Sequence, residues 1–253
     1  MSIVMRKMNL SVEIYKTRKA MGEAAGKKAE ELIVHWLKQK KEVRLIAGSA
    51  PSQNEIIAYL AKSRNIDWSR ITAFHMDEFI GIGEDSPQSF GKWMRDRLFS
   101  KVPMKKANYI WPGADPKKEC ERYAALLSKA PIDVVLAGIG ENGHLAFNDP
   151  PVADFKDPLL VKIITLDPAC RNQQFHDGYF ASLKEVPKQA ITITIPVITG
   201  ASSIVCTVPG PAKAKAVGAM FNGPVTTKCP ASILRYHHDC HVFLDSESGR
   251  ELL

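Results

Sequence analysis

The chain has 253 residues, of which 45% are hydrophobic and 24% charged, and this composition excludes disordered and collagen-like proteins. A formal charge of +7 favours an anionic partner, either nucleic acid or a phosphorylated metabolite. At this length we expect one α/β domain spanning residues 1–253.

Short β-branched runs alternate with glycine- or proline-bearing turns and amphipathic segments along the chain. This alternation predicts a three-layer α/β fold of the Rossmann-like kind, in which a mostly parallel, twisted sheet has helices on both faces. We expect strands at residues 12–15, 43–47, 71–76, 132–138, 161–166, 190–195, 203–208 and 241–244. We expect helices at residues 17–40, 52–62, 88–99, 116–129 and 212–221.

The location and partners of the chain follow from what its sequence lacks. No apolar run approaches the ~20 residues of a membrane helix, and no secretory signal is visible, so we expect no membrane partner. The five cysteines form no C-x-x-C pair, which predicts reduced thiols in a cytoplasmic protein. The lysines between residues 16 and 41 fit the solvated face of a helix, and without a nucleic-acid-binding motif beside them we expect no nucleic acid.

The first unusual loop follows the strand predicted at residues 43–47. Small residues open a helix here, namely Gly48, Ser49, Ala50 and Pro51. Such a turn presents free backbone N–H groups and the positive end of a helix dipole, which suit a phosphate. An ordinary cap, in which Ser49 or Ser52 satisfies the helix, is the favoured reading of this loop taken alone.

Two adjacent acids, Asp77 and Glu78, follow the strand predicted at residues 71–76. Ligands of parallel α/β sheets lie beyond the carboxyl ends of the strands, so a carboxylate here can act as a base on a carbon-bound proton. Because side chains of neighbouring residues diverge, we expect only one of the two to point into a cleft. A solvated turn explains this pair equally well.

The loop at residues 138–151 carries a formal G-x-G-x-x-G pattern. A dinucleotide-binding reading fails, because Pro150 and Pro151 stop any helix within about two turns. We interpret Gly138 and its neighbours as backbone that approaches a ligand closely. His144 and Asp149 lie on the same turn, where the carboxylate can orient the imidazole, and this favours a functional histidine.

Two further features are basic or metal-like. Lys213 starts a helix after the strand predicted at residues 203–208, where a cation is unfavourable unless an anion is bound, so it is a candidate phosphate ligand or a plain surface lysine. The string at residues 237–241, H-H-D-C-H, lies in a turn where adjacent histidines cannot easily face one ion, so we do not expect a metal there.

The motifs together resemble the glucosamine-6-phosphate deaminase (isomerase) family, which is related to the 6-phosphogluconolactonases. The resemblance covers roughly residues 43–245. It rests on F-x-M-D-E-F at 74–79, G-I-G-x-N-G-H-x-A-F-N-D-P at 138–150, V-P-K-x-A-I-T at 186–192, G-P-V at 223–225 and P-A-S-I-L at 230–234.

The resemblance implies a cytoplasmic enzyme without metal or cofactor that converts glucosamine 6-phosphate and water to fructose 6-phosphate and ammonia. In the family, an aspartate in the position of Asp77 moves the proton between C2 and C1 of the opened sugar. A histidine in the position of His144 opens the pyranose ring, assisted by flanking acids at the positions of Asn142 and Asp149. The glycine loop and the lysine that matches Lys213 hold the phosphate.

The chain departs from the family pattern at several positions. Asp149 stands where many deaminases have glutamate, and Asn142 stands where some have a charged aspartate. Ala50 and Ser49 stand in the places of the usual threonine and second glycine, which removes one hydroxyl donor, and His75 replaces an asparagine.

The family's phosphate-binding arginine should fall within residues 170–177. Arg171 is the only arginine in that segment, and the register that we expect places His176 at the family's position. Both are therefore candidate phosphate ligands.

Three functions remain open on the sequence. The first is deamination of an amino sugar phosphate, whose C4 configuration the sequence does not fix. The second is a lactone hydrolase of the 6-phosphogluconolactonase kind, in which His144 would activate water and Asp77 would be dispensable. The third is a non-catalytic sugar-phosphate sensor. Each takes a phosphorylated sugar as its partner, and the oligomeric state, a homo-oligomer included, is left open.

Overall fold

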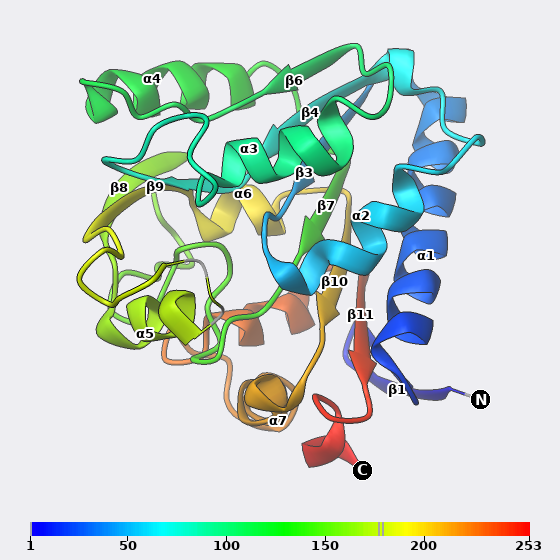
Figure 1. Cartoon of the computed structure of the whole chain (residues 1–253). Helices are drawn as coiled ribbons and strands as arrows, with labels where there is room; N and C mark the ends of the chain where they lie inside the picture. Colours follow the sequence, from blue (N-terminus) through cyan, green and yellow to red (C-terminus); the bar gives the residue numbers. More distant parts are fainter. Residues whose placement is uncertain (1, 177, 179) are drawn as a thin grey trace.

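The computed structural model describes residues 2–176, 178 and 180–253. In this part of the chain, eight strands form the main sheet, in the spatial order β1-β2-β11-β10-β7-β3-β4-β6 (Figure 1). Neighbouring strands are parallel except for β1 and β2. Their bounds are β1 Ile3–Lys7, β2 Leu10–Tyr15, β3 Val43–Ala47, β4 Ile71–His75, β6 Lys106–Asn108, β7 Val134–Ala137, β10 Ser203–Val208 and β11 Cys240–Asp245.

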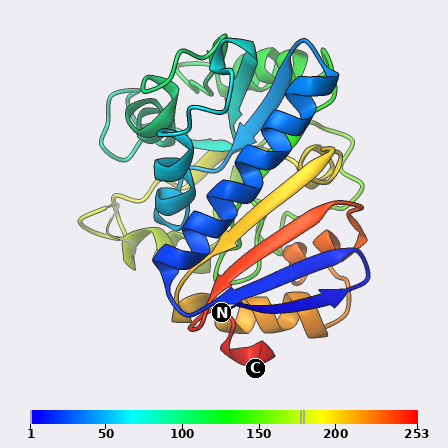
Figure 2. The ribbon, with the colours of Figure 1, turned by 90° about the vertical axis from the view of Figure 1, so that its right-hand side faces the viewer.

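Helices cover both faces of this sheet, which confirms the predicted three-layer arrangement. One face carries α1 (Arg18–Gln39), α2 (Asn54–Leu60) and α3 (Phe90–Met94), and Figure 2 shows α1 lying across it. The other face carries α4 (Pro116–Leu127), α6 (Ile195–Thr199) and α7 (Ala214–Asn222). Along β3, Leu45 packs into one layer and Ile46 into the other, because successive side chains of a strand point to opposite faces.

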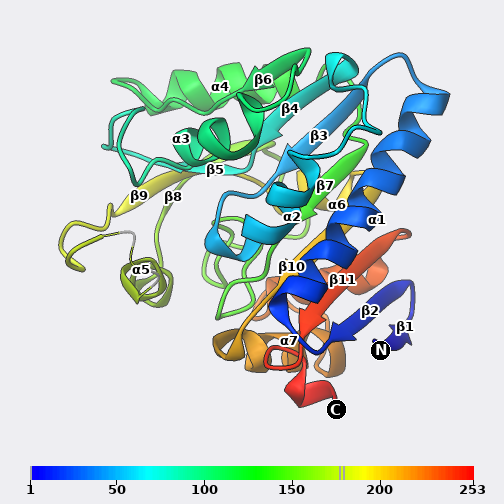
Figure 3. The same ribbon diagram turned by 45° about the vertical axis from the view of Figure 1, so that its right-hand side comes forward.

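A second, antiparallel sheet joins β5 (Asp77–Phe79), β9 (Gln189–Ile193) and β8 (Val161–Thr165). Figure 3 shows β8 and β9 beside α5 (Pro168–His176), away from the centre of the main sheet. The expectation that the strands at 161–166 and 190–195 belong to one mostly parallel sheet is therefore wrong for these two. Strand β9 pairs with β8 on one side and with residues 77–79 on the other, and the sequence predicts a loop for this last segment.

The sequence did not predict several elements, because each of them is exposed, short or polar. Strand β1 has two exposed hydrophobic residues, Ile3 and Val4, and β6 has only three residues. Helix α5 has a mean hydropathy typical of a polar segment, and α6 has only five residues. The helix predicted at 88–99 divides into α3 and a π-helical turn, Arg95–Phe99. In the part of the chain that the structure describes, no helix has the length and apolarity needed to cross a bilayer.

Helix α1 packs against α2 through two glycines spaced four residues apart, Gly22 and Gly26. A Cβ atom built on Gly22 would lie 2.1 Å from Cβ of Glu55. One built on Gly26 would lie 2.4 Å from Cγ of Tyr59. The two glycines therefore allow the helices to approach closely, and α2 carries the loop at 48–53 at its amino end.

Gly26→Ala should lower the free energy of unfolding by up to about 2 kcal/mol. Overpacking usually costs about 1–3 kcal/mol, and alanine returns roughly 1 kcal/mol of this because it favours the helix over glycine. Urea unfolding measures the difference. The control is Gly83→Ala, where a Cβ atom meets nothing within 4 Å. A Gly26→Ala protein that unfolds at the urea concentration of the control or above would contradict this account of the α1–α2 contact.

Candidate functional site

A cavity of about 160 Å³ opens at the carboxyl ends of β3, β4, β7 and β10, which is the edge where the sequence places the candidate residues. Its walls come from the segments that follow these strands, together with residues of α1 and α5. Seven of the predicted site residues line it: Gly48, Ser49, Ala50, Asp77, Gly138, His144 and Lys213.

Asp77 reaches the cavity from the junction between β4 and β5. The residue pairs with Thr192 of β9, and the backbone N–H of Ile193 donates to the carbonyl of Met76 (2.9 Å). Burial raises the pKa of Asp77 well above its usual value, the charge of Glu78 adds to this, and a hydrogen bond from the backbone N–H of Phe147 opposes it. A carboxylate in this setting is a stronger base than an exposed one.

Glu78 points away from the cavity and into the start of α3, so the prediction that only one of the two acids faces the cleft is confirmed. Burial raises the pKa of Glu78 to about 7, although the four hydrogen bonds that the carboxylate accepts lower it. The donors are Oγ of Ser89 (2.8 Å) and the backbone N–H groups of Phe79 (3.0 Å), Phe90 (3.2 Å) and Gly91 (2.8 Å).

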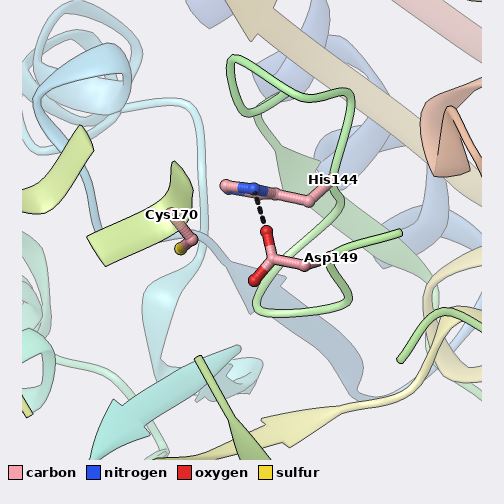
Figure 4. Close-up of side chains that lie close together, drawn as sticks. All are labelled: His144, Asp149 and Cys170. Atoms are coloured by element: carbon pink, nitrogen blue, oxygen red, sulfur yellow. Dashed lines mark ion pairs between the residues drawn. The ribbon is translucent and has the colours of Figure 1, made fainter. Parts of the chain in front are cut away.

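His144 and Asp149 form a hydrogen-bonded pair (Figure 4), with Nδ1 of the imidazole 2.8 Å from Oδ1 of the carboxylate. Asn142 contacts both residues of the pair. Its Nδ2 donates to Oδ1 of Asp149 (2.9 Å), and its Oδ1 lies 2.8 Å from Nδ1 of His144. Asp149 is fully buried, and although burial opposes ionisation, the contacts with His144 and Asn142 lower its pKa. His144 lines the cavity, whereas Asn142 and Asp149 support it from outside the cavity wall.

Gly140 makes room for the imidazole. A Cβ atom built on this residue would lie 2.1–2.3 Å from three ring atoms of His144. The glycine thus allows the backbone to lie flat against the ring. The prediction for this loop was close approach to a ligand, whereas the group that Gly140 approaches is the His144 side chain of the chain itself.

Cys170 of α5 completes a buried cluster with His144 and Asp149. The ligand atoms of the three residues lie within 4.8 Å of one another, and among the described residues they form the one such group able to hold a metal ion. Burial and the neighbouring Asp149 raise the pKa of the Cys170 thiol well above its usual value, so the thiol keeps its proton. A protonated thiol beside a carboxylate fits a hydrogen-bonded support for Asp149 better than a metal centre.

The histidine string at residues 237–241 forms no such cluster within the described chain. Nε2 of His237 lies 2.8 Å from the carbonyl of Ala201, and Nε2 of His241 lies 2.8 Å from Oδ1 of Asp239. Both histidines therefore bind neighbouring groups of the protein.

His75 also has a structural role. It is buried, its Nε2 accepts a hydrogen bond from the backbone N–H of Ile110 (2.7 Å), and burial lowers its pKa to about 3.

The loop at 48–53 does not end in a serine cap, so that interpretation is wrong. The helical turn Pro51–Gln53 has no side chain bonded to its first N–H groups. Oγ of Ser49 is buried and has no hydrogen-bond partner among the described residues, while Gln53 donates to the carbonyl of Ala137 (3.0 Å) and to Oγ1 of Thr207 (2.8 Å). Gln53 therefore ties the loop to β7 and β10, and Ser49 is left to face the cavity.

Arg18 is a cavity residue that the sequence analysis missed. Its Nε donates to Oε1 of Glu55 (2.8 Å), and its Nη2 donates to the carbonyl of Pro51. The position of Arg18 in the sequence could have indicated this role. Arg18 follows the carboxyl end of β2, which runs parallel to β11 in the main sheet, and ligands lie at that edge of such a sheet. Arg18 and Lys213 are the arginine and lysine that line the cavity in the described part of the chain.

The structure places neither Arg171 nor His176 in the cavity, so both are wrong as cavity ligands. Nη2 of Arg171 donates to the carbonyls of Leu183 (2.7 Å) and Val186 (2.9 Å), and His176 is exposed at the end of α5. The same helix turns Gln173 and Gln174 toward the cavity instead. Because α5 was not predicted, its buried face could not be known from the sequence.

The family model for glucosamine-6-phosphate isomerases and 6-phosphogluconolactonase matches residues 16–243. The chain belongs to this family.

The chain is similar to other proteins over most of its length. It is 36% identical over 231 residues to a glucosamine-6-phosphate deaminase of Exiguobacterium sibiricum, covering 88% of this chain and 89% of the relative. A deaminase of Thermoanaerobacter sp. is 34% identical over 234 residues, which cover 90% of each chain. A solved monomeric glucosamine-6-phosphate deaminase superposes with a TM-score of 0.86 at 29% identity, over 95% of this chain and 99% of that one. The 6-phosphogluconolactonase of Thermotoga maritima shares the fold, with a TM-score of 0.76 at 18% identity over 93% and 99% of the two chains.

If Arg18 and Lys213 together hold an anion in this family member, Arg18→Met and Lys213→Met should each weaken phosphate binding about tenfold or more. A hydrogen bond to a charged group contributes about 1.5–3 kcal/mol, and 1.4 kcal/mol is a factor of ten. Isothermal titration with inorganic phosphate measures the affinity. The control is Lys19→Met, next to Arg18 in sequence, whose side chain is 85% exposed. Variants that bind phosphate as tightly as the control would show that the anion lies elsewhere.

Proposed function

We propose that this chain converts glucosamine 6-phosphate and water to fructose 6-phosphate and ammonia. The observation that carries the proposal is that the buried Asp77 and the His144–Asp149 pair contribute to one cavity, whose wall also holds Arg18 and Lys213. A proton-transfer carboxylate, an oriented imidazole and an anion site are the three parts that the reaction needs.

Ring opening is the task of His144. Its Nδ1 is hydrogen-bonded to Asp149, which leaves Nε2 to exchange a proton with the sugar. The imidazole takes the proton of the C1 hydroxyl and returns a proton to the ring oxygen, so that the pyranose opens to the aldehyde. Asp149 stabilises the transient imidazolium, and Asn142 keeps the carboxylate in place.

Isomerisation is the task of Asp77. The carboxylate removes the proton from C2, and the electron pair of that bond forms the C1=C2 double bond of an enolamine. The electron pair of the C1 carbonyl moves to its oxygen, which takes a proton from the C2 ammonium group. Asp77 then returns the proton to C1, which gives a C2 imine. Water adds to this imine, and ammonia leaves as the ketone forms. The raised pKa of Asp77 suits the first step, because a more basic carboxylate is the better acceptor for a carbon-bound proton.

In this proposal the phosphate group of the sugar binds to Lys213 and Arg18. Oγ of Ser49, which has no hydrogen-bond partner among the described residues, is the third contact. Binding energy from this remote group orients the carbon atoms at Asp77. The chain has five cysteines, all described and all free thiols, which supports a reducing, cytoplasmic location.

Asp77→Asn should lower kcat for ammonia release from glucosamine 6-phosphate by about 10³-fold, since general-base catalysis contributes roughly 10²–10⁴. A coupled assay for ammonia measures it, and His144→Gln should cause a comparable loss because the ring then stays closed. Thermal unfolding confirms that each variant is folded.

Two outcomes would contradict the proposal. An Asp77→Asn protein that hydrolyses 6-phosphogluconolactone at the wild-type rate, with no ammonia release by the wild type, would point to the lactone hydrolase. Wild-type binding of several hexosamine phosphates with turnover of none would point to the sensor.

Glu78→Gln should move the acidic limb of the kcat/KM profile to lower pH. The negative charge of Glu78 helps raise the pKa of Asp77, so its removal makes ionisation of the catalytic carboxyl easier and lowers that pKa. Because Glu78 has a pKa of about 7, its charge acts on Asp77 only near and above that pH, and the pH–rate profile from pH 4 to 9 measures the shift. A limb that stays in place or moves to higher pH would show that Asp77 is not the base that the limb reports.

A further inference from the structure

A second and larger cavity lies at the opposite end of the main sheet. It measures about 480 Å³, and we call it the amino-end groove because residues at or near the amino ends of β3, β4, β6 and β7 line it. The last turn of α4 and the segment after it form the remaining wall. The groove takes no part in the chemistry described above, since Asp77 and His144 line the other cavity.

The groove is strongly basic. Five of its lining residues are cations and two are acids, Glu42 and Asp133. Each acid is already neutralised by a lysine: Asp133 pairs with Lys40, and Glu42 pairs with Lys105. Three of the cations, Arg44, Lys106 and Lys129, make no direct ion pair among the described residues, although Asp133 and Glu42 act on the charge of Arg44 from a greater distance.

Arg44 is the fixed element of the groove. Its side chain projects from the second residue of β3, where only 7% of the residue is exposed, and its guanidinium lies 4.9 Å from the ring centre of Phe74. Nη1 and Nη2 donate to the carbonyls of Leu127 (3.0 Å) and Leu126 (2.6 Å), the last residues of α4. These contacts hold the planar guanidinium in one orientation and leave further N–H groups to face a ligand.

Burial of the guanidinium is costly and lowers the pKa of Arg44, and the more distant charges of Asp133 and Glu42 offset this only in part. Two more buried polar side chains, Thr72 and Asn108, line the groove from neighbouring strands. An apolar wall would pack better against α4 and would carry no such cost. A polar, basic wall is what recognition of an anion requires, and an arginine fork matches the oxygens of phosphate.

We propose that the amino-end groove is a second binding site, for a small molecule that bears a phosphate group. Arg44 contacts the phosphate from the buried wall, and Lys106 and Lys129 contact it from the rim. The groove holds a ligand independently of the catalytic cavity, because its lining residues are a separate set.

Inorganic phosphate is the probe, and equilibrium dialysis over a range of phosphate concentrations gives the number of phosphates bound per chain and the affinity of each site. The wild type should bind two. Lys213→Met should weaken the site in the catalytic cavity about tenfold or more and leave the affinity of the groove unchanged. The double variant Lys106→Met, Lys129→Met should lower the affinity of the groove at least tenfold and keep the cavity site. Both lysines are exposed, so the fold tolerates their replacement.

The matched control is Lys117→Met, an exposed lysine at the other end of α4, which should bind two phosphates like the wild type. The proposal is overturned if Lys213→Met abolishes all phosphate binding, or if the double variant binds as the control does. Because the readout is stoichiometry and not turnover, a failure of the deaminase proposal leaves this result interpretable.

Discussion

Strand β9 holds the two halves of the catalytic cavity together, and the rest of the site depends on it. On one side Thr192 pairs with Asp77, and the N–H of Ile193 bonds to the carbonyl of Met76. On the other side Oγ1 of Thr192 accepts from the backbone N–H of Phe147 (3.1 Å), and the carbonyl of Ile193 accepts from Nδ2 of the fully buried Asn148 (2.9 Å). Two adjacent residues thus fix the base and the histidine loop relative to each other, although some 70 residues of chain separate the two.

This arrangement crowds three buried carboxyl groups around one site, and their different partners give them different roles. Glu78 is surrounded by four donors, three of them backbone N–H groups, and caps α3. Asp149 is stabilised as a carboxylate by His144 and Asn142. Asp77 has no cation beside it among the causes that set its pKa, and the charges of Glu78 and Asp149 both raise that pKa. Asp77, the carboxylate whose negative charge has the least stabilisation, is therefore the one that faces the cavity, as expected for a general base.

The sequence predicts the parallel core and most of the cavity, because both follow from short-range patterns. Buried strands such as Val134–Ala137 are apolar throughout, and the residues after the parallel strands gather at one sheet edge by topology alone. What the sequence could not predict depends on the direction in which individual helical side chains point. The buried face of α5 brings Gln173 and Gln174 to the cavity in place of Arg171 and His176. Arg18 reaches it from the first turn of α1, far from any motif.

The structure of the Asp77→Asn protein with glucosamine 6-phosphate tests the central claim most directly, since the substrate is held but not converted. The account predicts the phosphate against Lys213 and Ser49, His144 beside the ring oxygen, and C2 about 3–3.5 Å from the side chain of residue 77, the separation of reacting atoms. A sugar bound in the reverse direction, with its C1 and C2 atoms at the glycine loop and its phosphate at residue 77, would contradict it.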